Sequence, residues 1–214
     1  VAGQGGFRLA DPSLVDAVGS LDALWAPRIE RALLGLHEHA GVWLERIAVA
    51  GESLDERYLQ RLGEGLKLKG LRRLAIDRMC DARLGVRSDG RFGFAHGLIR
   101  EAFRTRADRS GRLPEHHALL AECLMERTSP DPVAVGRHLL LGGRPGHAAR
   151  MLVVGLGEHR TRFGERAGLM ACALAQRALT GRPASDPDWG RVALENARAL
   201  YGAGEQVAAR DAVN

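Results

Sequence analysis

The segment RFGFAHGLIREAF, residues Arg91–Phe103, decides the fold of this chain. It begins with a short alternating stretch that carries two aromatic side chains, Phe92 and Phe94, on one face. His96 and an apolar-periodic segment follow, which predicts a strand that runs directly into a helix. Ser88–Gly90 has the sequence Ser-Asp-Gly, and Asp-Gly between two alternating segments is a strong signal for a tight hairpin.

The flanking segments extend this pattern upstream. We expect residues 83–88 to pair with residues 91–94 as the two strands of the hairpin. The apolar residues predicted to lie opposite one another are Leu84 and Val86 on the first strand and Phe92 and Phe94 on the second. Helical periodicity begins at Ser13, and it predicts one helix with Pro27 in its first turn that continues through Ile29, Leu33 and Leu36, and further helices over residues 42–49, 55–66 and 71–79.

Several helices, a two-stranded wing and another helix, in this order, are typical of a winged-helix domain. Such domains usually recognise a partner or act as switches, and they rarely catalyse reactions. We therefore predict a winged-helix domain over residues 13–112. Residues 1–12 are Gly-rich and loosely patterned, which predicts a linker or an edge segment.

The second half of the chain has no strand signal and predicts only helices, separated by short Gly, Pro and Asp breaks. The expected ranges are 114–127, 131–142, 146–160, 164–180, 187–202 and 204–213. Two junctions, His138–Leu152 and Ala199–Val213, are alike, because an apolar helix ends at glycines and paired alanines follow on the next helix. Small residues there allow antiparallel helices to approach closely, as in tetratricopeptide-like hairpins of about 34 residues. The predicted fold is thus mainly α, a winged helix followed by a helical-hairpin array over residues 113–214.

The net positive charge of the chain is weak evidence for a nucleic-acid partner. The formal net charge is +5, but Lys67 and Lys69 are the only lysines, so nearly all of the basic residues are arginine. Arginine-rich composition beside much Ala, Gly, Leu and Val indicates compositional bias as much as selection for nucleic acid. Basic and acidic residues alternate along the sequence, which is typical of solvated helix faces.

Cysteine usage and hydropathy indicate a cytoplasmic chain. Cys80, Cys123 and Cys172 are far apart, form no CxxC pair and lie in apolar helical contexts, which favours buried free thiols over disulfides or a metal site. No apolar run is long enough to span a membrane, and no signal peptide is visible. The first residue is Val1 rather than Met, and we expect that the chain derives from a longer polypeptide.

Several short motifs give the chain a specific resemblance. They are LWAPRIE at residues 24–30, LERIAVAG at 44–51, FGFAHGLIRE at 92–101, and GRHL at 136–139 with the Ala pair at 148–149. On these residues the chain resembles the segment that follows the nucleotide-binding domain in STAND-class signalling ATPases. Proteins of this class combine a P-loop ATPase, a winged helix and a helical repeat array. Some bacterial members carry a Ser/Thr protein kinase, and others end in a DNA-binding domain.

The resemblance implies a regulatory function. This chain would be a non-catalytic segment that couples nucleotide state to the binding of a protein partner or effector on its repeats. ADP or ATP with Mg²⁺ would be held by the upstream nucleotide-binding domain, which would itself be a partner of this chain. The full-length protein would be an ATPase, a Ser/Thr protein kinase or both.

His96 is the candidate binding residue that the resemblance implies. In this class a histidine at the strand-to-helix corner of the winged helix contacts the phosphate of bound ADP. Gly97 stands here where that class commonly has Asp. An imidazole that donates a hydrogen bond to phosphate would stabilise the diphosphate-bound closed state. The alternative is that His96 only caps the helix or fills a polar corner, and both interpretations stay open.

A cluster of arginines allows an alternative function, a DNA-binding winged-helix transcriptional regulator. In such proteins the helix before the wing enters the major groove and the wing touches the DNA backbone or the minor groove. The candidate contact residues are Arg72, Arg73, Arg78, Arg87 and Arg91, with Arg83 nearby. Asp77, Asp81 and Asp89 oppose them, and we favour an arginine-rich solvated surface over nucleic-acid binding.

The sequence predicts no catalytic residue and no metal ligand. It has no GxxxxGK[ST] motif for phosphates and no HRD, DFG or VAIK element of a protein kinase. His116 and His117 are adjacent and would point about 100° apart on a helix, so they cannot easily share a metal. We expect them to form a surface or half-buried pair. His37 and His39 fail the same test.

Overall fold

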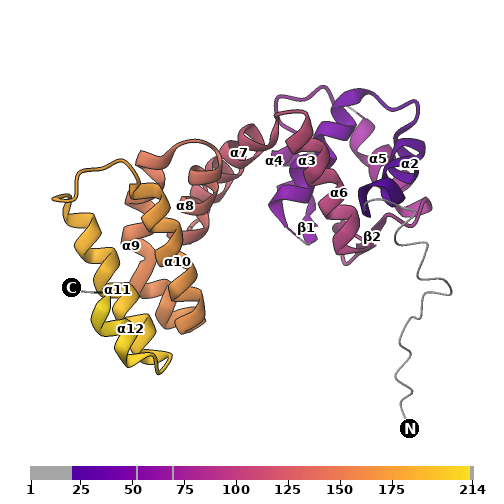
Figure 1. Ribbon diagram of the computed structural model, residues 1–214. Coiled ribbons are helices and arrows are strands. Elements are labelled where there is room, and N and C mark those ends of the chain that lie inside the picture. Colours follow the sequence, from indigo (N-terminus) through magenta and orange to yellow (C-terminus); the bar gives the residue numbers. More distant parts are fainter. Residues whose placement is uncertain (1–20, 52, 69, 213–214) are drawn as a thin grey trace, which may run out of the picture. The chain divides into compact units, whose positions relative to one another are not determined.

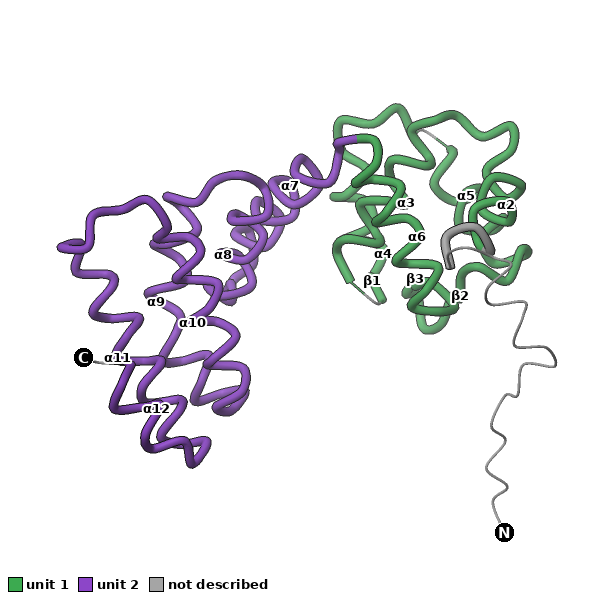
Figure 2. The backbone as a smooth tube through the Cα atoms, viewed as in Figure 1, with its two compact units in different colours: residues 1–110 green, residues 111–214 purple. Residues whose placement is uncertain are grey.

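The computed structural model describes residues 21–51, 53–68 and 70–212. The chain forms two compact units, residues 1–110 and 111–214, shown in green and purple in Figure 2. The sequence predicts this junction at residues 112/113. The predicted linker over residues 1–12 and the start of the helical pattern at Ser13 lie outside the described residues.

The described part of the chain is mainly helical, with one small antiparallel sheet, so the coarse fold prediction is confirmed (Figure 1). The elements of the first unit are α2 (Leu21–Leu33), α3 (Glu38–Ala50), β1 (Ser53–Asp55), α4 (Glu56–Leu62), α5 (Leu71–Asp81), β2 (Gly85–Ser88), β3 (Arg91–Phe94) and α6 (Gly97–Arg109). The predicted hairpin and the helix that follows it are therefore present.

The sheet contains a strand that the sequence does not predict. Its order is β1-β3-β2, and both pairings are antiparallel. β1 has only three residues and one apolar side chain, Leu54, so its periodicity is too short to detect. Leu54 pairs with Phe92, so β1 lies along the edge of β3 opposite to β2. β1 therefore joins the sheet through a contact between residues far apart in the sequence.

The predicted facing of the hairpin side chains is wrong. Val86 pairs with Gly93 and is 53% exposed, whereas Phe92 is buried and pairs with Arg87. The turn explains this register. Asp89 and Gly90 both have positive φ angles, +50° and +70°, as in a two-residue type I′ turn, and a turn of this length fixes every pair beyond it.

Two helix boundaries also differ from the prediction. Pro27 lies inside α2 rather than in its first turn, because the good helix formers before it extend the helix to Leu21. α4 ends at Leu62 and not at residue 66. The end is set from another helix, since the Arg46 guanidinium of α3 donates hydrogen bonds to the carbonyls of Leu62 (3.0 Å) and Glu64 (3.1 Å).

The core of the first unit is built around α3, whose Trp43, Leu44 and Ile47 are buried. The Trp43 indole N–H donates to the carbonyl of Leu59 at 3.0 Å, which ties α3 to α4. The residues that fill the rest of this core are Leu59, Leu62, Met79, Leu84, Phe92, Ile99 and Phe103. A fully buried carboxylate, Glu45, pairs with Arg106 at 3.1 Å and thereby links α3 to α6.

The second unit consists of α7 (Leu113–Met125), α8 (Pro132–Leu141), α9 (Pro145–Phe163), α10 (Glu165–Leu179), α11 (Pro187–Gly202) and α12 (Gln206–Asp211). These helices occupy the six predicted ranges, with ends that differ by a few residues. α9 packs between α8 and α10, and α11 packs against α10 and α9. Their buried side chains, which include Leu139, Leu152, Leu156, Ala175 and Leu179, form one hydrophobic core.

The two junctions that look alike in sequence have the same backbone structure. Each contains a glycine with positive φ, Gly143 at +75° and Gly204 at +87°. In both, the residue after this glycine donates its N–H at 2.9 Å to the carbonyl five positions earlier, which is a Schellman motif. The same glycine-terminated turn therefore connects α8 to α9 and α11 to α12.

Glycine also permits the close approach of α8 and α9. A Cβ atom on Gly136 would lie 2.6 Å from Cγ of Leu152, and one on Gly155 would lie 2.9 Å from Cβ of Pro132. Neither distance is compatible with a side chain. The helices can pack this closely only because both positions are glycine.

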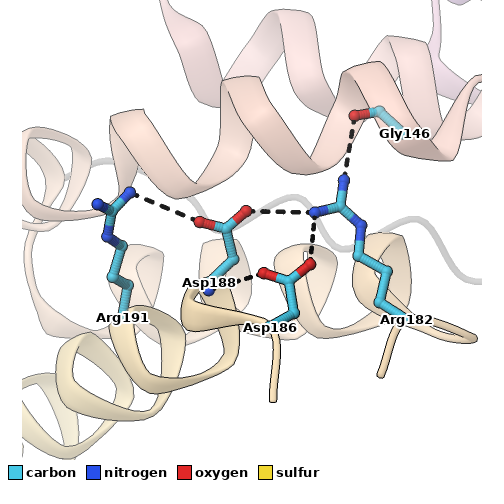
Figure 3. Close-up of polar contacts among 5 residues, drawn as sticks. All are labelled: Gly146, Arg182, Asp186, Asp188 and Arg191. Carbon is cyan, nitrogen blue, oxygen red and sulfur yellow. Dashed lines mark hydrogen bonds and ion pairs between the residues drawn. The ribbon is translucent and has the colours of Figure 1, made fainter. Parts of the chain in front are cut away.

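A single arginine organises the longer connection between α10 and α11 (Figure 3). One nitrogen of Arg182 lies 3.1 Å from Asp186 and 3.3 Å from Asp188, and the other donates to the Gly146 carbonyl at 3.4 Å. Asp188 also pairs with Arg191 at 3.5 Å. Arg182 thus holds the start of α11 against the start of α9.

Candidate functional site

His96 lies at the corner where β3 ends and α6 begins, and it is the N-cap of α6. Its Nδ1 accepts a hydrogen bond from the backbone N–H of Leu98 at 3.1 Å. A ring that accepts at Nδ1 carries the hydrogen of its neutral form on Nε2. The residue is exposed, and no described group bonds Nε2, so a donor is available there. The predicted cap is present, and it leaves the other ring nitrogen for a ligand.

Aromatic packing fixes the position of this corner. The ring of Phe94 lies 5.8 Å from that of buried Phe92 and 5.1 Å from that of Phe103 on α6, measured between centroids. Phe103 is fully buried. The strand that precedes His96 and the helix that follows it therefore share one aromatic cluster, which holds the imidazole on a rigid support.

Most of the candidate nucleic-acid contacts are engaged within the protein. Asp77 on α5 lies 3.8 Å from Arg73 of the same helix and 3.5 Å from Arg87 of β2. The Arg78 guanidinium donates to the carbonyl of Leu34. The structure thus brings Arg73 and Arg87 together, but around a carboxylate that neutralises part of their charge.

The two remaining candidates are Arg91 and Arg72. Arg91 on β3 donates to the hydroxyl of Ser53 at 3.2 Å and to its backbone carbonyl, so it joins β3 to β1. Arg72 lies half-buried near the start of α5, beside Gly63. Four of the five candidate arginines therefore have a carboxylate or backbone carbonyl partner within the described part of the first unit.

The adjacent histidines of α7 are more buried than the sequence indicates. His116 is fully buried and His117 is 4% exposed, so the expectation of a surface or half-buried pair is wrong. The Nδ1 atoms of His117 and His138, on α8, are 2.9 Å apart. Contact with a residue 21 positions away cannot be found from local spacing. The contact links α7 to α8 through a hydrogen bond in which Nδ1 of one ring donates and Nδ1 of the other accepts.

The cysteines are free thiols that the fold protects. Burial, together with the nearby Glu195 carboxylate, raises the pKa of Cys172 to about 11. Burial also raises the pKa of Cys80 above its ordinary value. Cys123 is buried as well. At neutral pH Cys80 and Cys172 remain protonated and are therefore weak nucleophiles.

Within the described residues, no three side chains of metal-binding type converge on one point. Residues 21–212, apart from the two omitted positions, also contain no helix with the length and apolar character needed to cross a membrane. Comparison with known proteins finds no matching family model, no similar curated protein and no similar solved structure.

Proposed function

We propose that the first unit is a winged-helix domain, that the second is a tetratricopeptide-like array, and that together they form the non-catalytic regulatory segment of a STAND-class signalling ATPase. In this proposal the first unit responds to the nucleotide state of an upstream domain. The second unit binds a protein partner or effector in the cytoplasm. ADP or ATP with Mg²⁺ is held by the upstream ATPase, which the full-length protein carries with or without a Ser/Thr protein kinase.

The order of elements from α3 to β3 is the observation that carries this proposal. It runs helix, strand, two helices and two strands, and the strand between the first two helices pairs with β3. This order, with a short hairpin as the wing, is the arrangement expected of a winged helix. The repeated Schellman turns of the second unit support the array in the same way.

His96 supplies the proposed contact with the nucleotide. Its Nδ1 is occupied by the α6 cap, and its Nε2–H is free to donate to a phosphate oxygen presented by another domain. Because the cap and the aromatic cluster fix the ring, the donor would be pre-organised. A hydrogen bond made only to the diphosphate-bound form would favour the closed state.

The test uses the intact gene product and two substitutions. His96→Ala removes both the cap and the phosphate donor, whereas His96→Ser keeps a good N-cap and removes only the imidazole. We expect both variants to retain less ADP after purification than wild type, and the Ser variant to be as stable as wild type. Unchanged ADP content in the Ser variant would contradict the proposal.

The geometry of the arginines weighs against the DNA-binding alternative. Asp77 offsets Arg73 and Arg87, and two other arginines bond to backbone carbonyls. We therefore expect the chain to bind duplex DNA no more tightly than a non-specific basic protein. Sequence-dependent binding, with an affinity that falls steeply with salt, would favour the transcriptional regulator instead.

A further inference from the structure

The second unit contains an open hollow of about 730 Å³ that no step above uses. It lies where α9 ends, α10 begins and the α11–α12 hairpin turns, and these last two helices are yellow in Figure 1. Small side chains from α11 and α12, Ala197 and Ala209, line it. Tyr201 also lines it and is 67% exposed, so the hollow combines apolar surface with an uncovered aromatic ring.

The charges around the hollow do not balance. Arg160 lies 3.3 Å from Glu165 and 3.5 Å from Glu195, and Glu195 also pairs with Arg198. These two carboxylates match two guanidinium groups. Arg210 lines the hollow, is exposed, and has no carboxylate partner among the described residues. One positive charge is therefore left over at this site.

Two glycines make room for the ion pair between Glu165 and Arg160. A Cβ atom on Gly202 would lie 2.5 Å from Cδ of Glu165, and one on Gly168 would lie 2.8 Å from Cγ of Arg160. The ion pair thus packs directly against the backbone of two helices. Glu165 is held on Arg160, which leaves Arg210 unmatched.

We propose that this hollow docks a short peptide segment of a partner protein that presents a carboxylate next to an apolar side chain. The carboxylate pairs with Arg210, and the apolar side chain packs on Tyr201 and the two alanines. Charge complementarity selects an acidic segment over a basic one. This inference names the partner chemistry for the second unit and in that respect rests on the proposed function.

The first part of the test compares two peptides on the 214-residue chain. One is a blocked octapeptide that alternates Glu with Leu, and its counterpart has Gln at every Glu position. In ¹⁵N-labelled protein, we expect the Glu peptide to shift the amide signals of Tyr201, Gly202 and Ala209, with weaker binding at higher salt. The Gln peptide should bind at least about threefold more weakly, as loss of one partly exposed ion pair implies.

The second part uses surface variants with matched controls. Arg210→Gln and Tyr201→Ser should each weaken binding of the Glu peptide about threefold or more. Arg137→Gln on exposed α8 surface and Val154→Ser, where the side chain is 76% exposed on α9, should leave it unchanged. All four positions are on the surface, and circular dichroism checks that the helices are retained.

Several results would overturn the inference. The inference would be wrong if the two peptides bound with equal affinity, or if neither bound at millimolar concentration. It would also be wrong if the control variants lost as much affinity for the Glu peptide as Arg210→Gln and Tyr201→Ser. A dimer that Arg210→Gln dissociates would overturn it too, because a second copy would then occupy the hollow. The His96→Ser experiment measures ADP retention through the first unit, whereas the peptide experiment measures binding to the second unit. Failure of the proposed function is therefore distinguishable from failure of this inference.

Discussion

Histidine side chains in the first unit act on the backbone. His37, His39 and His96 each accept a backbone N–H at Nδ1, at 3.2, 3.0 and 3.1 Å respectively. His37 and His96 cap the starts of α3 and α6, whereas His39 binds the N–H of Lys67 in the loop after α4, and each bond holds one tautomer. Of the three, only His96 lies at the corner where the aromatic cluster supports a rigid ring. This difference makes His96 the residue of this group on which a functional role can be built.

Arg83 is a residue held in an unfavourable conformation. It follows the end of α5 with φ of +56°, and its N–H donates to the carbonyl of Cys80 at 2.9 Å. Glycine adopts this conformation without strain, so Arg83→Gly should raise the free energy of unfolding by about 0.5–1 kcal/mol. Arg83→Ala keeps the strain and should change stability little. Denaturant unfolding measures both, and equal values for the two variants would contradict the account.

Asp186 gives a pH-dependent contribution to stability. Its carboxylate accepts the N–H of Asp188 and faces Arg182, and both lower its pKa in the folded state. Stability from this carboxylate is therefore present above its unfolded pKa of about 3.9 and is lost as the pH falls through the folded value. Asp186→Asn keeps an N-cap but does not titrate, so its unfolding midpoint should depend less on pH below about 5. Identical pH profiles for wild type and variant would disprove this role.

At the scale of the element, the sequence predicts what local periodicity determines. The Asp89-Gly90 turn and the alternating strands identify the hairpin, and apolar spacing identifies the six helices of the second unit. β1 and the end of α4 escape prediction because distant groups determine them. Leu54 pairs with Phe92 across the sheet, and Arg46 of α3 binds the carbonyls at the end of α4. Contacts of this kind have no signal in a local window.

Glycines within helices have opposite roles that substitution should separate. At Gly136 a methyl group would overlap Leu152, so Gly136→Ala should lower the free energy of unfolding by about 1–3 kcal/mol. At Gly190 in α11 a methyl group would meet open space, so Gly190→Ala should raise it by about 0.5–1 kcal/mol. Thermal or denaturant unfolding measures both changes. If the free energy of unfolding changed in the same direction in both variants, the packing described would be contradicted.

On the scale of the whole molecule, each unit has a hydrophobic core of its own. The core of the second unit uses residues from α7 to α11 alone, and Trp43, Phe92 and Phe103 centre that of the first. Residues 1–110 and 111–214, expressed separately, should each be helical and unfold cooperatively. Circular dichroism with denaturant measures this. A half that remains unfolded alone would show that its core depends on the other.

The candidate sites show the same division between local and distant information. The capping role of His96 follows from its place after a strand and before a helix, and the cap is formed. The phosphate-binding role follows only from the family resemblance. The sequence already shows aspartates near the candidate arginines, which indicates that part of their charge is neutralised. Only the fold shows that Asp77 joins α5 to β2, and that Arg210 is an arginine of the hollow without a carboxylate partner in the described part of the chain. Sequence therefore finds the residue types, and tertiary structure decides which of them are engaged.

The proposed function makes this chain the regulatory segment of a larger signalling ATPase. The most direct test is the intact mass of the native gene product isolated from its own cells. We expect a species much larger than the 23.1 kDa of these 214 residues, with bound adenine nucleotide. A native product of 23.1 kDa would have no room for an ATPase domain and would contradict the proposed function.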